Sequence, residues 1–162
     1  LLQMLDDMLI VARLENSNLR FSPETVKVGT FVGRIVNEFQ VVHEEDHRLQ
    51  YDCQFSGDLQ TDSRLLRQIV VNLIKSAIKD SAPESTVLVG LYDADRDCVL
   101  TVQHAGGGLE TVEEPLSIAD EGMESGLGLA IVDRAVDMCG SFLQIEKLPD
   151  GGVKSTVTFP AR

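Results

Sequence analysis

Basic residues are scarce in this chain of 162 residues. Lysine and arginine together number 14, against 26 aspartates and glutamates, so the formal net charge is −12. Proteins that bind nucleic acid use clustered lysines and arginines to neutralise phosphate groups. We therefore expect no nucleic-acid partner.

Long apolar runs are also missing. No stretch approaches the roughly 20 apolar residues of a membrane-spanning helix, and no signal peptide is recognisable. The only cysteines are Cys53, Cys98 and Cys139, an odd number without Cys-x-x-Cys spacing. These absences predict a cytoplasmic protein with reduced thiols and no membrane contact in this fragment.

What is present is an ordinary globular composition, 43% hydrophobic and 25% charged. The length predicts one domain, with room for an appendage. Because the chain starts with leucine inside a helical pattern, we expect it to be a piece of a longer protein.

The most strongly patterned stretch is residues 61–81, where adjacent apolar pairs recur every four residues. This spacing predicts a helix with one broad buried stripe. Thr61 or Asp62 is its expected N-cap, and Pro83 prevents its continuation. The stripe consists of Leu65, Leu66, Ile69, Val70, Leu73, Ile74, Ala77 and Ile78.

One edge of this helix is polar. Asn72, Ser76 and Lys79 recur at helical spacing, so their side chains are expected to lie along the same edge. A polar edge on a buried helix needs solvent, another polar group or a ligand as its partner.

The N-terminal residues 1–20 carry a wide apolar stripe on a helix too short to be stable alone. We predict that this helix belongs to a helical-hairpin dimer stem. Docking on its own domain is the alternative.

Further helices are predicted at residues 31–42 and from residues 126–129 onward, the latter closed by Gly140. The expected buried face of the first is Phe31, Val32, Ile35, Val36, Phe39 and Val42. Strands are predicted at residues 25–28, 48–55, 86–92, 98–103, 141–146 and 153–159, with a turn at 56–58 leading to the central helix. Together, these elements predict a two-layer α/β sandwich with about five strands and three helices on one face. We assign residues 1–21 to the stem and 22–162 to this domain.

Two glycine clusters flank an acidic segment. The first spans residues 105–109 and the second spans 126–129. Exposed glycine amides and helix N-termini both favour phosphate, although glycine-rich turns are more often simply turns.

In this order and spacing the motifs resemble the catalytic, ATP-binding domain of sensor histidine kinases, of the GHKL (Bergerat-like) ATPase fold with a mixed sheet. Residues 62–79 resemble the N box of that family, 104–109 its first glycine box and 124–132 its second. Residues 1–21 are similar to the end of the dimerisation and phosphoacceptor hairpin. The nucleotide-binding positions that this resemblance implies are Asn72, Ser76, Lys79, His104, Gly106, Gly108, Gly126 and Gly128.

Several of these positions depart from the family pattern. Ser76 stands where the family has an asparagine that ligates Mg²⁺, an ion that prefers closely held oxygen ligands. His104 stands where the family has an aspartate that accepts a hydrogen bond from adenine. Asp80 and Glu124 add negative charge where the family has a packing residue and a glycine.

The lid between the glycine boxes departs as well. Fifteen residues separate Gly108 from Glu124, and the phenylalanine-bearing motif of the family is missing. The lid carries the acidic residues Glu110, Glu113, Glu114, Asp120 and Glu121. Because one lost charged contact costs about 1–3 kcal/mol, these departures together predict a large loss of ATP affinity.

We therefore predict a degenerate histidine-kinase-like domain with no catalytic residue of its own and no bound cofactor. ATP and Mg²⁺ are the cofactors if the pocket still works, and the alternative is an active kinase domain with an atypical pocket. The resemblance implies a homodimer through the stem and a response-regulator receiver domain, or a partner kinase, as the signalling partner.

A remote alternative is zinc chemistry. His43, Glu44 and His47 match the His-Glu-x-x-His pattern of zinc proteases, and His104 is an imaginable third ligand. The motif closes a helix with further acidic residues, which is typical of a solvated helix end, so we assign no metal site.

Overall fold

The structure is a computed structural model that describes residues 5, 8–9, 21–45, 47–105 and 123–160; for 123–127 it describes the backbone only. The predicted stem (1–21), the first glycine box beyond Ala105 and the acidic lid therefore lie almost wholly outside the described residues. The domain assigned to residues 22–162 is largely within them.

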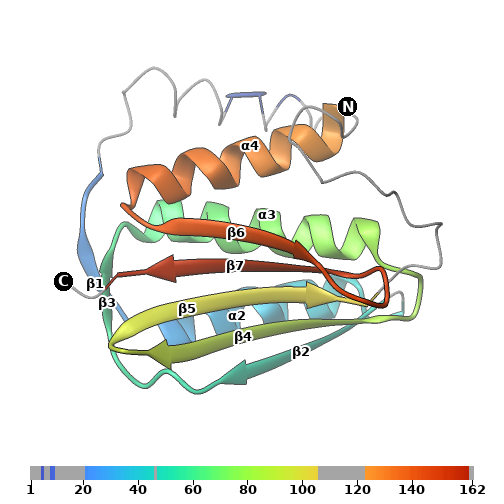
Figure 1. Ribbon diagram of the computed structural model, residues 1–162, viewed down its shortest axis with the longest axis horizontal. Coiled ribbons are helices and arrows are strands. Elements are labelled where there is room, and N and C mark those ends of the chain that lie inside the picture. Colours follow the sequence, from blue (N-terminus) through green and yellow to red (C-terminus); the bar gives the residue numbers. More distant parts are fainter. Residues whose placement is uncertain (1–4, 6–7, 10–20, 46, 106–122, 161–162) are drawn as a thin grey trace.

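Five strands form the main sheet, in the order β2 (Arg48–Cys53), β4 (Thr86–Ala94), β5 (Asp97–His104), β7 (Val153–Phe159) and β6 (Phe142–Lys147). Strand β2 is parallel to β4, and the other pairs are antiparallel. Figure 1 shows these strands stacked as one twisted layer. The predicted mixed sheet of about five strands is confirmed.

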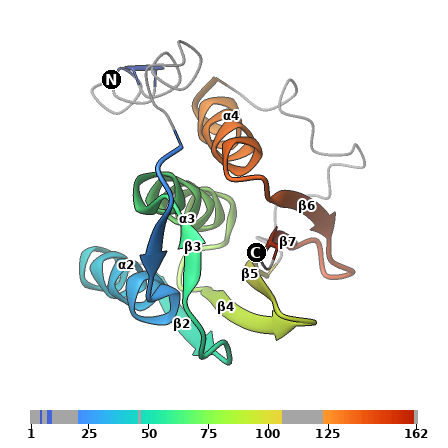
Figure 2. The same ribbon diagram turned by 90° about the vertical axis from the view of Figure 1, so that its left-hand side faces the viewer.

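Three helices cover one face of the sheet: α2 (Val28–Val42), α3 (Ser63–Asp80) and α4 (Met123–Met138). Figure 2 shows the three helices as one layer and the strands of the main sheet as a second layer beside them. This arrangement is the predicted two-layer α/β sandwich. Among the described helices, none has the length and apolar character needed to cross a bilayer.

A second, small sheet joins β1 (Glu24–Val26) to β3 (Leu59–Thr61) in antiparallel pairing. The strand predicted at residues 25–28 lies here. Strand β3 was not predicted; it lies between the turn predicted at 56–58 and the central helix. With three residues, β3 is too short to show an alternating pattern.

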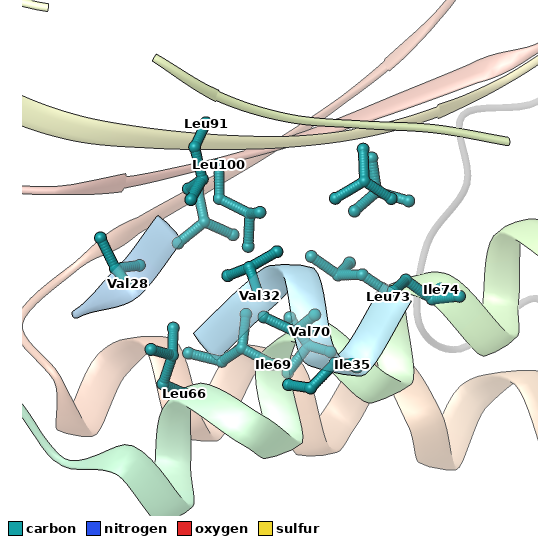
Figure 3. Packing of buried hydrophobic residues seen from close by; sticks show 14 of the residues in the cluster. Val28, Val32, Ile35, Leu66, Ile69, Val70, Leu73, Ile74, Leu91 and Leu100 are labelled. Carbon is teal, nitrogen blue, oxygen red and sulfur yellow. The ribbon is translucent and has the colours of Figure 1, made fainter. Parts of the chain in front are cut away.

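The buried stripe of α3 is the centre of the core. Its predicted residues are all buried, except for Ile78, which is half-buried. Figure 3 shows residues of this stripe next to Val32 and Ile35 of α2, with the sheet residues Leu91 and Leu100 above them. Since burial of a large apolar side chain stabilises by about 1.5–3 kcal/mol, this helix fixes the position of both layers.

Helix α2 follows its predicted pattern except at its end. Val32, Ile35 and Val36 are buried, but Val42 is 74% exposed. The helix ends at Val42, and both Val41 and Val42 in this last turn are exposed, so the expected burial of Val42 was wrong.

Helix α4 begins at Met123, three residues before the start predicted at residues 126–129. The predicted C-terminal glycine is confirmed. Gly140 has φ 67°, its N–H donates to the Asp137 carbonyl, and the Ser141 N–H donates to the Val136 carbonyl. These two bonds form a Schellman motif, which satisfies carbonyl groups at the helix end.

Candidate nucleotide site

The polar edge of α3 is present in the structure. Asn72 is 5% exposed, and its side-chain amide donates to the Gln68 carbonyl at 2.7 Å. The Ser76 hydroxyl donates to an Asp80 carboxylate oxygen at 3.5 Å, one helical turn further along. The amide and the hydroxyl therefore have local partners on their own helix.

His104 lies at the end of β5 and is only 5% exposed. Its Nδ1 atom lies 2.9 Å from the Ala105 carbonyl oxygen. Because a carbonyl only accepts hydrogen bonds, Nδ1 carries the proton, and in the neutral ring Nε2 is then an acceptor. The position keeps an acceptor without the negative charge of an aspartate.

A small cavity lies where α3 meets the end of β5. Its volume is about 20 Å³, which is room for about one water molecule. Ser76 and Asp80 line it from α3, and His104 lines it from β5. The other lining residues are Leu73, Ala77, Val102, Leu129, Ile145, Val153 and Ser155.

Asp80 is the residue that the predicted site omitted. It lies two turns beyond Asn72 on the same edge; Asp80 and Lys79 are both exposed residues, but only Asp80 lines the cavity. Burial is the largest influence on its carboxyl and raises its pKa, against the lowering effects of His104, Lys79 and Ser76. The helical spacing from Asn72 was the signal that could have included Asp80.

Helix α4 brings the second glycine box beside this edge. A Cβ atom added at Gly128 would lie 3.7 Å from the Asn72 side-chain oxygen. Gly126 lies one half-turn earlier in the same helix. The structure thus joins Asn72, Ser76, His104 and Gly128 in one region, while Gly106 and Gly108 lie outside the described residues.

The histidines of the zinc alternative lie elsewhere. The rings of His43 and His47 meet edge-on with centroids 6.4 Å apart, at the end of α2. Both ring nitrogens of His47 are buried without a hydrogen-bond partner. Within the described part of the chain, however, no three histidines, cysteines, aspartates or glutamates gather in a way that could hold a metal ion, and His104 lines the separate cavity at α3.

A sandwich with these motifs at the helix–sheet junction defines a class of nucleotide-binding fold. Residues 61–162 match the family described as "Histidine kinase-, DNA gyrase B-, and HSP90-like ATPase". The chain belongs to this family.

Within the family, the similar curated proteins are histidine kinases. The chain is 26% identical over 179 residues to the circadian input-output histidine kinase CikA of Synechococcus elongatus, covering 99% of the chain and 23% of CikA. It is 26% identical over 167 residues to the phosphate regulon sensor protein PhoR of Pseudomonas aeruginosa, covering 96% of the chain and 38% of PhoR. The chain thus spans only part of the length of these relatives.

Solved structures of histidine kinases share the fold. Full-length ShkA in complex with AMPPNP has a TM-score of 0.76 at 24% identity, over 98% of this chain and 35% of ShkA. The mycobacterial sensor histidine kinase MprB has a TM-score of 0.70 at 24% identity, over 87% of this chain and 99% of that one. The predicted resemblance to histidine kinase catalytic domains is therefore confirmed.

Proposed function

We propose that this chain is a signalling module of a two-component system whose ATP site has degenerated. Its family and its histidine kinase relatives support the signalling role. The observation that carries the degeneracy is the cavity at the C-terminal end of α3. There, three positions that depart from the family pattern, Ser76, Asp80 and His104, line the same cavity.

The chemistry of the same residues supports this proposal. The Ser76 hydroxyl is shorter than the asparagine side chain that the resemblance implies for Mg²⁺, and in this structure it donates to Asp80. The Asp80 carboxylate adds a negative charge beside the position of an anionic nucleotide, which opposes binding. His104 supplies at most a neutral acceptor.

Such a module acts by association. We propose that residues 1–21 form a homodimer stem ahead of the domain at 22–162, on the cytoplasmic side of the membrane. The domain then contacts a receiver domain of a response regulator or regulates a partner kinase. The relatives matched here are longer proteins, so these partners belong to the whole protein of which this chain is the kinase-like part.

Titration with a fluorescent ATP analogue and Mg²⁺ tests the proposal. We expect no saturable binding at millimolar ligand, which corresponds to a binding free energy weaker than about −4 kcal/mol. The matched variant carries Ser76→Asn, Asp80→Phe and His104→Asp, which restore the pattern of the family. It is expected to gain saturable binding. Saturation of the unsubstituted chain well below millimolar would contradict the degeneracy.

The second candidate is an active ATP-binding domain with an atypical pocket. The specific observation in its favour is the Nδ1 contact of His104, which leaves Nε2 as an acceptor in the neutral ring. In that case ATP should raise the melting temperature in proportion to ln(1 + [L]/Kd), and Lys79→Ala should abolish the shift. A melting temperature that does not respond to ATP would exclude this candidate.

A further inference from the structure

A buried carboxylate ties the N-terminal segment of the domain to α3. Asp62 is 1% exposed and forms the N-cap of α3. One of its oxygens accepts from the Arg64 backbone N–H at 2.9 Å, and the other accepts from the Ser22 backbone N–H at 3.0 Å. Ser22 is 40 residues away in sequence, so this contact connects two separate parts of the chain.

A second hydrogen bond links the same two parts of the chain, with the acceptor now in the N-terminal segment. The Glu24 carboxylate accepts from the Ser63 backbone N–H at 3.3 Å, which satisfies another free amide of the first helical turn. We call the pair of contacts Ser22–Asp62 and Glu24–Ser63 the clasp. Phe21 packs against the core just before it, and β1 pairs with β3 just after it.

Helix capping alone does not account for the clasp. A serine or asparagine at position 62 could bond the Arg64 N–H equally well. Only a carboxylate provides a second acceptor oxygen in the same side chain, and that oxygen reaches Ser22. The guanidinium of Arg64 also bonds both oxygens, at 3.1 and 2.7 Å, and holds the carboxylate in this orientation.

We propose that the clasp makes residues 21–26 part of the rigid domain and is the element through which the N-terminal segment acts on α3. Movement of the chain ahead of Phe21 is then transmitted to α3 and is not absorbed between residues 22 and 26. The same helix carries Ser76 and Asp80 at the cavity. The clasp is thus a conformational device that connects the N-terminal segment of the domain to the candidate site, whether or not that site binds nucleotide.

Hydrogen–deuterium exchange of the full chain tests this inference. Asp62→Asn keeps one acceptor for the helix cap but loses the second acceptor oxygen and the charge. We expect amides of residues 22–26 to exchange about 10- to 100-fold faster, because loss of a hydrogen bond to a charged group opens the segment locally. Amides in the middle of α3 should speed up much less than those of residues 22–26.

Two controls separate a clasp from a general loss of stability. Arg64→Ala keeps the carboxylate and both backbone donors, so exchange at residues 22–26 should rise far less than in Asp62→Asn. Local opening should also give rates that do not change with low concentrations of denaturant. Unchanged exchange at residues 22–26 in Asp62→Asn, or an equal increase over the whole chain, would overturn the proposal.

Discussion

The two ends of α3 use aspartate in opposite ways. At the N-terminal end, hydrogen bonds from Arg64 and Ser22 outweigh burial and lower the pKa of the Asp62 carboxyl. At the C-terminal end, burial dominates and raises the pKa of the Asp80 carboxyl. One carboxylate is held by donors that the fold supplies, while the other lines a cavity and has a single long bond from Ser76.

Helix α4 repeats this contrast because it runs antiparallel to α3. Its C-terminal Cys139 receives a hydrogen bond from the Thr61 hydroxyl, beside Asp62. Its N-terminal part places Gly128 against Asn72, on the side of the cavity. The molecule therefore has a structural end around Thr61, Asp62 and Gly140 and a cavity end around Asn72, Asp80 and Gly128. Residues at the structural end are held by hydrogen bonds within the fold, whereas those at the cavity end line or adjoin the cavity.

Substitution of the two aspartates tests the contrast most strongly. We expect Asp62→Ala to lower the free energy of unfolding by about 3 kcal/mol, because it removes a helix cap and leaves charged and backbone donors without their acceptor. Asp80→Ala should stay within about 1 kcal/mol of the wild type, since Asp80 is exposed and accepts only a 3.5 Å hydrogen bond from Ser76 among the described residues. Urea unfolding at neutral pH measures both. Equal losses at the two positions would contradict the division.

The pH dependence of stability should separate the same two groups with opposite signs. The lowered pKa of Asp62 gives stability that is present above the ordinary value of 3.8 and is lost as the pH falls through the lowered pKa. The raised pKa of Asp80 makes stability fall as the pH rises from 3.8 through the raised pKa, because the folded state binds the proton more tightly.

Unfolding free energies measured between about pH 3 and pH 7 report both slopes. Asp62→Asn should remove part of the loss on the acid side, and Asp80→Asn should remove the decline above 3.8. If Asp80→Asn leaves the profile of the wild type unchanged, the cavity does not perturb this carboxyl.

Local periodicity was enough to predict most of the fold. The stripe of α3 and its Asp62 cap follow from spacing and helix-end chemistry within 20 residues. Short or marginal features were not predictable in this way. Strand β3 has only three residues, and Val42 continues the apolar period of α2 although its side chain is exposed at the end of the helix.

The candidate site was predictable only in part. The N-box edge was visible because Asn72 and Ser76 share a helix face. Asp80 and His104 line one cavity because α3 packs against the end of β5. The sequence has no local signal for this packing. The same holds for Ser22 and Asp62, which are 40 residues apart. Contacts between distant segments are set by the closed fold and not by the pattern of either segment.

The smallest expected effects come from one glycine at each end of α4. Gly140 has φ 67°, a conformation that L-residues adopt at a cost, so Gly140→Ala should lower stability by about 1 kcal/mol. Gly128 lies within the helix, and a Cβ there makes only ordinary contact with Asn72 at 3.7 Å. Gly128→Ala should therefore raise stability by about 0.5–1 kcal/mol, the usual gain in a helix interior. Urea unfolding of the two variants decides whether the fold requires Gly128. If Gly128→Ala lowers the free energy of unfolding as much as Gly140→Ala does, Gly128 belongs to the structural end. If Gly128→Ala raises it as expected, packing does not account for the glycine beside the cavity.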